Sequence, residues 1–277
     1  MEMGFTPEFL RDLQFWFRRR AAMQPGARVS NFSEQAIIEK YIRELHITDR
    51  TAVDIGAGDG IRSSNTFRLF ANGWTGLGIE ADPAKAARLG KAYSGFHRVN
   101  SIEAAVQPDT VCGLLSNNGV EHDFGLLSID IDGNDYWVLN AILEQYRPRL
   151  IVSEYNEKIP PPLRFVVDYD PGFTLRHHFY GYSIAKLKDL LDKHEYVLLE
   201  IEYNNVFLAP KELGIVGKTV EQAYDEGYRD RSDRLDKFPD NRNMEPLLNM
   251  SPEDAVVFLN DFYKPYAGQY SLEAGQA

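Results

Sequence analysis

The sequence predicts an α/β fold: a doubly wound, mostly parallel seven-stranded sheet with helices on both faces and an antiparallel hairpin at one edge. Strand-like and helix-like runs alternate from residue 35 to residue 208, which is typical of a parallel sheet. Runs such as Leu150-Ile151-Val152 are continuously apolar, as expected for strands buried on both faces. The last two strand-like runs meet across Tyr203 and Asn204, which predicts the edge hairpin.

The individual elements follow from local signals along the chain. Pro83 stands in the first turn of its helix, where a missing N–H is harmless. Asn134, Ser183 and Ser251 supply capping oxygens at the starts of three further helices. The expected strands are 51–55, 75–81, 96–100, 124–132, 148–155, 196–202 and 204–210. The expected helices are 35–45, 64–72, 83–93, 108–118, 134–146, 183–194 and 251–263.

The chain divides into a main domain at residues 31–210 and two additions. Residues 1–30 contain an amphipathic helix with Phe9, Leu10, Leu13, Trp16 and Phe17 on one face, which we expect to pack on the body or on a second subunit, with a membrane surface as the remaining alternative. Residues 211–277 form a polar, turn-rich tail with one helix, which we also expect to pack on the body or on a partner copy. The segment 156–182 is too long for a plain connection, and we expect it to form a substrate lid.

The composition narrows the class of protein. A net charge of −11 argues against a general nucleic-acid binder, because an acidic surface repels phosphate backbones. A single cysteine, Cys112, excludes an intrachain disulfide and fits a reducing compartment, so we expect a cytoplasmic protein. No apolar run approaches 18 residues, and the N-terminal arginines follow the apolar stretch, the reverse of a signal peptide, so we expect no stable membrane insertion.

The stretch TAVDIGAGDGIRSSNT, residues 51–66, joins an expected strand to a glycine-rich turn. It lacks the lysine of a phosphate-binding Walker loop, which excludes a nucleotide triphosphatase. The dinucleotide pattern needs a third glycine where Ile61 stands, and Gly60 comes one residue early. Asp54, at the end of the strand, would repel a pyrophosphate but pairs well with a cationic ligand. The turn therefore favours a ligand that carries positive charge.

Glu80 ends the next expected strand, where a carboxylate can accept hydrogen bonds from both hydroxyls of a ribose. Nicotinamide-dependent folds share this position, so the residue alone does not separate the two cofactors. A purely structural role, next to the start of the helix at 83–93, is the alternative.

Acidic residues gather at the ends of two further strands. Asp130 and Asp132 alternate at the end of the strand at 124–132, and Glu154 and Asn156 follow the next strand. Neighbouring parallel strands would bring these side chains together as an all-oxygen set suited to Mg²⁺ or Ca²⁺. Two alternatives stay open: capping and solvated acids at the sheet edge, or acids that act on substrate or cofactor without a metal.

The pattern D-x-G-x-G-x-G resembles the first motif of S-adenosylmethionine-dependent methyltransferases with a Rossmann-like fold. With GWTGLGIEADP and LLSIDIDGNDYWVL, the region 30–210 looks like the FkbM-type branch, which methylates hydroxyls of natural products and sugars. The resemblance implies that S-adenosylmethionine is bound by Asp54, Gly56, Ala57, Gly58, Asn65, Glu80, Ala81 and Asp130.

The same resemblance implies a divalent metal such as Mg²⁺. Related macrolide-sugar O-methyltransferases hold one with acids after the fourth and fifth strands. By position, Asp132 and Glu154 match two of these ligands, and Asn156 replaces a third. The sequence departs from the FkbM pattern at Ser128, which stands where that pattern has lysine, and at Asp132, where it has glutamate. The lysine or histidine base of metal-dependent relatives has no counterpart in IDGNDY.

The lid segment offers a base and two cations. His177, or its neighbour His178, is a candidate general base, because a neutral imidazole has a suitable pKa. Arg164 and Arg176 could bind a carboxylate or phosphate of the substrate. The predicted catalytic residues are thus Asp132, Glu154 and His177.

The function that the sequence favours is methyl transfer to a small-molecule acceptor. A nicotinamide-dependent oxidoreductase is a second hypothesis, but Ile61 and the lack of a Tyr-x-x-x-Lys pair speak against it. A third hypothesis is a non-catalytic binding protein or scaffold that retains the fold.

Overall fold

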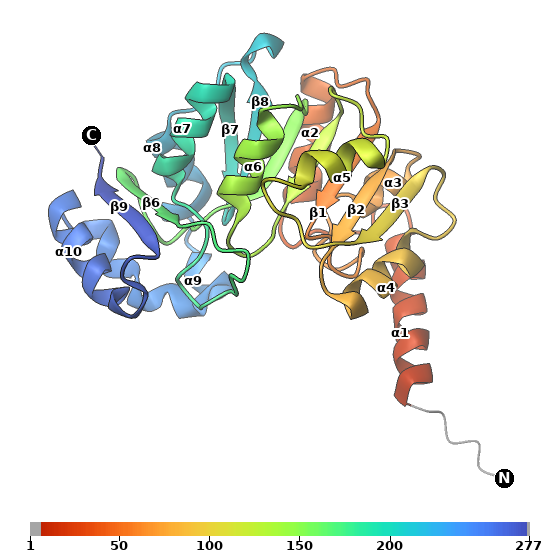
Figure 1. The fold of residues 1–277 in the computed structure, drawn as a ribbon, viewed down its shortest axis with the longest axis horizontal. Helices are drawn as coiled ribbons and strands as arrows, with labels where there is room; N and C mark the ends of the chain where they lie inside the picture. The colour runs from red at the N-terminus through yellow and green to blue at the C-terminus, as the bar shows by residue number, and fades with distance from the viewer. Residues whose placement is uncertain (1–6, 276–277) are drawn as a thin grey trace.

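A seven-stranded sheet forms the centre of the computed structural model, which describes residues 7–275 (Figure 1). The strand order is β3-β2-β1-β4-β5-β8-β7; β1 to β5 are parallel, and β8 is antiparallel to both of its neighbours. The strands of this sheet are β1 (Thr51–Ile55), β2 (Thr75–Glu80), β3 (Val99–Glu103), β4 (Leu126–Ile129), β5 (Leu150–Glu154), β7 (Tyr196–Glu202) and β8 (Asn205–Pro210). The predicted sheet with its hairpin at one edge is confirmed; within that hairpin β7 is the outer strand.

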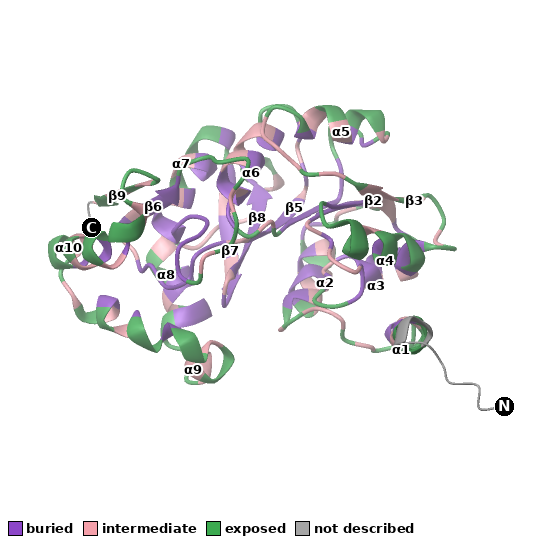
Figure 2. Ribbon diagram, turned by 60° about the horizontal axis from the view of Figure 1, so that its bottom comes forward, coloured by how far each residue is buried: buried purple, intermediate pink, exposed green. Residues whose placement is uncertain are grey.

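Helices cover both faces of the sheet, as predicted. One apolar core includes Ile37, Phe70 and Leu89 from α2, α3 and α4, and the other includes Leu115, Leu139 and Leu187 from α5, α6 and α7. Figure 2 shows the large sheet mostly buried between these layers. The helices are α1 (Pro7–Ala22), α2 (Glu34–Glu44), α3 (Phe67–Ala71), α4 (Pro83–Tyr93), α5 (Val111–Asn117), α6 (Asp135–Leu143), α7 (Ile184–His194), α8 (Val220–Tyr224), α9 (Arg234–Lys237) and α10 (Pro252–Phe262). Five short turns of other helix types are η1 (Lys211–Leu213), η2 (Asp225–Arg229), η3 (Pro239–Asn243), η4 (Glu245–Asn249) and η5 (Lys264–Tyr266).

Several predicted boundaries differ from the structure near the glycine turn and the acids. Helix α3 begins only at Phe67, because residues 61–66 continue the turn. Strand β4 ends at Ile129, so Asp130 to Asp132 lie in the following turn rather than in the strand. The carboxylate of Asp135 stabilises that turn by accepting the backbone N–H groups of Ile131 and Gly133, both at 2.9 Å.

A second, two-stranded sheet joins the lid segment to the C-terminal tail. Strand β6 (Leu163–Val167) pairs antiparallel with β9 (Tyr270–Ala274), and sequence reasoning missed both strands. A third apolar core, which includes Phe165, Phe179, Leu259 and Tyr263, packs this sheet against α10. Figure 1 places β6, β9 and α10 together at one end of the molecule. We call residues 156–182 and 234–274 together the cap.

Helix α1 touches the body through one side only. Phe15 is buried, Arg18 forms an ion pair with Asp59 at 3.0 Å, and Arg19 donates to the carbonyls of Ala92 and Ser94. The other side carries Leu10, Leu13, Trp16 and Phe17, whose exposed fractions run from 40% to 56%. The side chain of Phe9, predicted on the same apolar face, lies outside the described residues.

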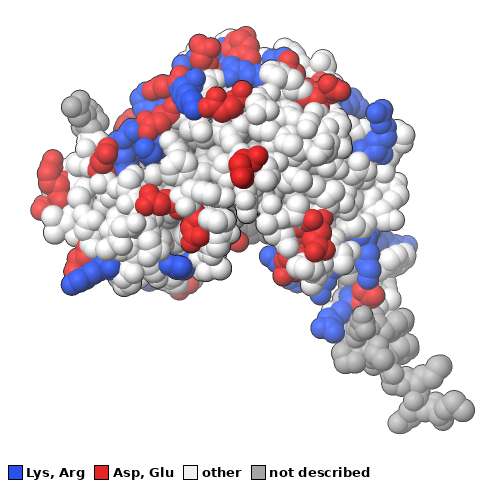
Figure 3. All heavy atoms as spheres, in the orientation of Figure 1, with Lys and Arg blue, Asp and Glu red and all other residues white. Residues whose placement is uncertain are grey.

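Charged side chains of both signs are interspersed on the face of the molecule drawn in Figure 3. Within residues 7–275, no helix combines the length and the apolar character needed to cross a bilayer.

Candidate functional site

The glycine turn lies where the strand order reverses, between the carboxyl ends of β1 and β4. Ligands of open α/β sheets bind at this place. Gly56 has φ +80°, and a Cβ atom there would lie 1.7 Å from the carbonyl oxygen of Asp130, so only glycine lets the two strand ends approach. The N–H groups of Gly56 and Ala57 both donate to the carbonyl of Ile79, at 2.9 and 3.0 Å. These bonds tie the turn to the end of β2.

Glu80 is held in place at the end of β2. It is buried, and its two carboxylate oxygens accept the backbone N–H groups of Gly58 and Asp82, each at 2.8 Å. Each oxygen keeps a further lone pair for a ligand. The carboxylate is therefore fixed before any ligand arrives.

A first cavity of about 390 Å³ opens above this carboxylate. Four predicted cofactor residues line it: Gly56, Glu80, Ala81 and Asp130. Its walls also include apolar side chains from four separate segments, namely Ile79, Ala104, Val106, Ile131 and Phe173. The cavity thus combines an apolar wall with carboxylates at the sheet edge.

Asp54 and Asn65 stand behind the turn rather than on the first cavity. The carboxylate of Asp54 is buried and accepts the hydroxyl of Thr66 at 2.6 Å, and burial raises its pKa to about 6. Asn65 donates from Nδ2 to the Ser128 hydroxyl at 3.1 Å, and its Oδ1 has no partner among the described residues. Asp54 therefore lies under the turn beside Thr66, and its contact with a ligand's amino group stays a prediction.

Three carboxylates meet at the ends of β4 and β5. One oxygen from each of Asp130, Asp132 and Glu154 lies within 4.8 Å of the other two. The turn after β4 creates this arrangement, because Asp132 adopts a left-handed φ of +59°. Asp130 reaches solvent in the first cavity, yet the surrounding protein, Asp135 and Asp132 together raise its pKa to about 7. Burial and Asp130 raise the pKa of Glu154 as well.

Two observations indicate that this cluster could hold a divalent cation. All of its donors are oxygens, which Mg²⁺ and Ca²⁺ prefer. One carboxylate oxygen of Glu154 accepts from Asn204 at 2.9 Å, while the other, Oε2, is buried without a partner among the described residues.

Asn156, predicted as a third metal ligand, lines neither cavity. Its side chain is fully buried, Nδ2 donates to the carbonyls of His178 and Tyr180 at 2.9 and 3.0 Å, and Oδ1 has no partner among the described residues. The chain leaves β5 after Glu154, so the alternation that placed Asn156 beside Glu154 no longer applies. In the structure, Asp130 occupies the third position of the cluster.

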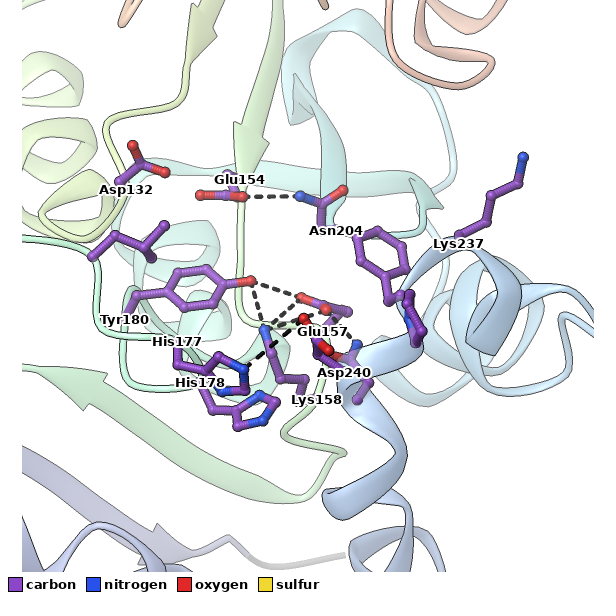
Figure 4. Close-up of a pocket in the computed structure, with 14 residues that line it drawn as sticks. Asp132, Glu154, Glu157, Lys158, His177, His178, Tyr180, Asn204, Lys237 and Asp240 are labelled. Atoms are coloured by element: carbon purple, nitrogen blue, oxygen red, sulfur yellow. Dashed lines mark hydrogen bonds and ion pairs between the residues drawn. The ribbon is translucent and has the colours of Figure 1, made fainter.

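A second cavity, of about 270 Å³, lies between the sheet edge and the cap (Figure 4). Asp132 and Glu154 lie along one side of it, and Lys158, His177 and His178 lie along the opposite side. Asp132 also lines the first cavity, so the two cavities adjoin at the carboxylate cluster.

A buried polar network in the second cavity escaped sequence reasoning. Glu157 accepts Asn241 Nδ2 at 2.7 Å and the Tyr180 hydroxyl at 2.8 Å, and Lys158 Nζ donates to the same hydroxyl at 2.9 Å. Glu157 and Lys158 are both buried, and Lys158 Nζ lies 3.3 Å from Glu157 Oε1. The sequence feature that could have indicated this network is the charged pair Glu157-Lys158, which stands directly before the apolar, proline-rich run Ile159–Pro162.

The two lid histidines differ sharply. His177 lines the second cavity, but its side chain is 62% exposed, and its Nε2 lies 4.0 Å from Asp240. His178 is buried, and burial, Lys158 and His177 lower its pKa to about 4.

The lid arginines do not line either cavity. Arg164 pairs with Asp189 of α7, and Arg176 donates to Gln269 at 3.2 Å. The predicted recognition of a substrate carboxylate or phosphate by these arginines receives no support from their positions.

Comparisons with known proteins give distant matches of fold. No protein-family model matches the sequence, and no curated protein matches it. Among solved structures, an O-methyltransferase from Bacillus cereus in complex with S-adenosylhomocysteine has a TM-score of 0.44 and 15% identity, covering 75% of this chain and 92% of its own. An amino pentose methyltransferase of calicheamicin biosynthesis from Micromonospora echinaspora has a TM-score of 0.42 and 14% identity, covering 76% and 98%. An S-adenosylmethionine-dependent methyltransferase from Clostridium acetobutylicum has a TM-score of 0.44 and 9% identity, and the match covers 72% of this chain and 99% of its own. At this distance, the function must be argued from the site itself.

Proposed function

We propose that the protein is an S-adenosylmethionine-dependent methyltransferase that acts on a hydroxyl of a small molecule, in the manner of the FkbM-type branch. The observation that carries the proposal is the meeting of the two cavities at Asp132, where β1, β4 and β5 end. One cavity contains the fixed carboxylate of Glu80, and the other is polar and covered by the cap. Transfer of a group between two bound molecules requires such adjoining sites.

The first cavity fits S-adenosylmethionine in size and chemistry. Its volume of about 390 Å³ lies in the range of small-molecule sites. Glu80 can accept ribose hydroxyls, and Ala104, Val106 and Phe173 offer apolar contact for the adenine. The carboxylates of Asp130 and Asp132 favour a ligand with ammonium and sulfonium charges. When bound, this cofactor supplies a methyl carbon that the acceptor oxygen attacks as the carbon–sulfur bond breaks.

The carboxylate cluster is placed to orient the acceptor and to take its proton. Asp132 and Glu154 line the second cavity at the side where it meets the first. Burial and neighbouring acids raise the pKa of both groups, which brings them closer to the neutral range where a general base works well. His177 is the second candidate base, and it lies on the opposite side of that cavity.

A divalent cation on the cluster is an alternative role for these carboxylates, because as metal ligands they could not also take the proton, and His177 would then be the candidate base. Asp130, Asp132 and Glu154 would hold it through three carboxylate oxygens. When bound, the cation offsets the repulsion among these groups and lowers the pKa of an acceptor hydroxyl.

The geometry disfavours the nicotinamide-dependent alternative. Dinucleotide folds place the pyrophosphate at the N-terminus of a helix that directly follows the glycine turn. Here residues 61–66 separate Gly60 from the start of α3 at Phe67. The side chain of Asp130 on the first cavity would also repel the pyrophosphate.

Isothermal titration calorimetry tests the proposal, with S-adenosylhomocysteine and NAD⁺ as ligands. We expect micromolar binding of the former and none of the latter. Binding of NAD⁺ alone would favour the oxidoreductase, and binding of neither would favour a non-catalytic protein.

A further inference from the structure

His178 is a buried side chain whose hydrogen-bonding groups are unused. It is 3% exposed, and neither Nδ1 nor Nε2 has a partner among the described residues. The residue nevertheless lines the second cavity, on the side opposite Asp132 and Glu154 (Figure 4). Buried polar groups in folded proteins almost always have partners, so an unused ring that lines a cavity points to a ligand.

The backbone on both sides of this ring is held firmly. The carbonyl of His178 accepts Asn156 Nδ2 at 2.9 Å and the Tyr263 hydroxyl at 2.8 Å. The ring packs against His177 at 3.9 Å between centroids and against Phe262 of α10 at 5.7 Å. The ring is therefore placed by its packing against His177 and Phe262 and by two hydrogen bonds to the carbonyl of its own residue, while its nitrogens have no partner among the described residues.

Burial is the main influence on the protonation of the ring. It lowers the pKa of His178, Lys158 and His177 lower it further, and together they outweigh the opposite effects of Glu157 and Asp240. The imidazole is consequently neutral at pH 7, with one nitrogen as donor and the other as acceptor. A ligand hydroxyl can accept from the N–H of one nitrogen or donate to the other nitrogen, and because the two nitrogens point to different sides of the ring it uses one of them at a time. A carboxylate or phosphate would find only one donor on the ring and would lie beside Glu157 and Asp240; of the two lysines on this cavity, Lys158 is already paired with Glu157 and Lys237 is the other.

We propose that His178 binds a second, uncharged hydroxyl of the acceptor, across the second cavity from the hydroxyl that is methylated. This inference rests on the proposed function, which places the reacting hydroxyl beside Asp132 and Glu154. It makes the acceptor a neutral molecule with at least two hydroxyl groups, one at each side of the cavity. It also assigns His178 to acceptor binding rather than to proton transfer.

The first test compares two buried histidines. His178→Phe removes nitrogens that have no protein partner, so the melting temperature of the unliganded protein should stay at or above the wild-type value. His194→Phe is the matched control, because His194 is also buried but its Nε2 contacts Asn140 Oδ1 at 3.0 Å, so its melting temperature should fall. A fall for His178→Phe as large as that for His194→Phe would overturn the proposal, since His178 would then be a structural residue.

The second test measures binding directly, with myo-inositol as a neutral polyol probe and cyclohexanol as its single-hydroxyl control. In ¹⁵N-histidine-labelled protein saturated with S-adenosylhomocysteine, myo-inositol should shift the His178 ring nitrogens, and cyclohexanol should not. The affinity for myo-inositol should fall about tenfold or more in His178→Phe and partly recover in His178→Gln, which keeps a donor and an acceptor.

An unchanged His178 signal, or equal affinity of His178→Phe and wild type for myo-inositol, would overturn the proposal. The affinity for S-adenosylhomocysteine, measured on the same samples, should be the same in all variants. If the wild-type protein did not bind S-adenosylhomocysteine, the proposed function would be contradicted. That result differs from one in which S-adenosylhomocysteine binds but His178 does not respond to myo-inositol.

Discussion

The substitution Glu80→Gln separates the role of this carboxylate in ligand binding from that in holding the turn. Each oxygen of Glu80 accepts one backbone N–H at 2.8 Å, from Gly58 and from Asp82, and each has one further lone pair for a ribose hydroxyl. Glutamine turns one of these acceptors into an N–H₂ donor. That donor would face a backbone N–H on the protein side, and it would no longer accept from the ribose with a full charge.

The expected losses follow from these contacts. A hydrogen bond to a charged group contributes about 1.5–3 kcal/mol. Weakening the ribose contacts by about 3 kcal/mol corresponds to roughly a hundredfold loss of affinity for S-adenosylhomocysteine. The unfavourable contact of the amide with the turn should lower the free energy of unfolding by about 1–3 kcal/mol.

Calorimetric titration and urea unfolding measure the two losses on the same preparation. Glu103→Gln is the matched control, because Glu103 ends the adjacent strand β3 in register with Glu80 but is exposed. Its affinity and stability should equal those of the wild type. If Glu80→Gln bound S-adenosylhomocysteine as tightly as Glu103→Gln, the placement of the ribose at Glu80 would be refuted.

Three further predictions concern the cluster, the turn and α1. Mg²⁺ should raise the melting temperature of the wild type, because it binds the folded state at the carboxylate cluster, and it should not raise that of Glu154→Gln. If neither the melting temperature nor turnover responded to EDTA or Mg²⁺, the proposed metal site would be rejected. Burial raises the pKa of Asp54 from its ordinary 3.8 to about 6, so the folded state holds this proton more tightly than the unfolded state does. As the pH rises from about 4 to 8 the proton is lost, and the free energy of unfolding of the wild type should fall by up to about 3 kcal/mol relative to that of Asp54→Asn. A urea-unfolding difference that does not change with pH would contradict this. We also predict self-association through the apolar side of α1, so Trp16→Glu should lower the mass measured by light scattering, and a wild-type protein that is already monomeric would exclude it.

The sequence was most informative where residue pattern and backbone periodicity agree. The parallel strands, both helix layers and the edge hairpin follow from apolar runs alternating with amphipathic helices. Glu80 and Asp130, two of the predicted cofactor residues, line the same cavity, because strand ends in a parallel sheet meet at one edge.

The cap could not be predicted from local patterns, because its structure depends on contacts between distant segments. Strand β6 finds its partner β9 more than a hundred residues later, and Asn241 reaches back to Glu157. The role of Asn156 was missed for a similar reason, since it is set by carbonyls of the lid. The shape of the acceptor cavity therefore depends on the tail, whose polar sequence gives little sign of it.

A crystal structure with S-adenosylhomocysteine and Mg²⁺ tests the central claim most directly. We predict density for the ribose hydroxyls at Glu80, for the adenine between Ala104 and Phe173, and for the sulfur facing Asp132 at the junction of the two cavities. Density for the ligand at any other place, or a first cavity that stays empty at saturating ligand, would contradict the account.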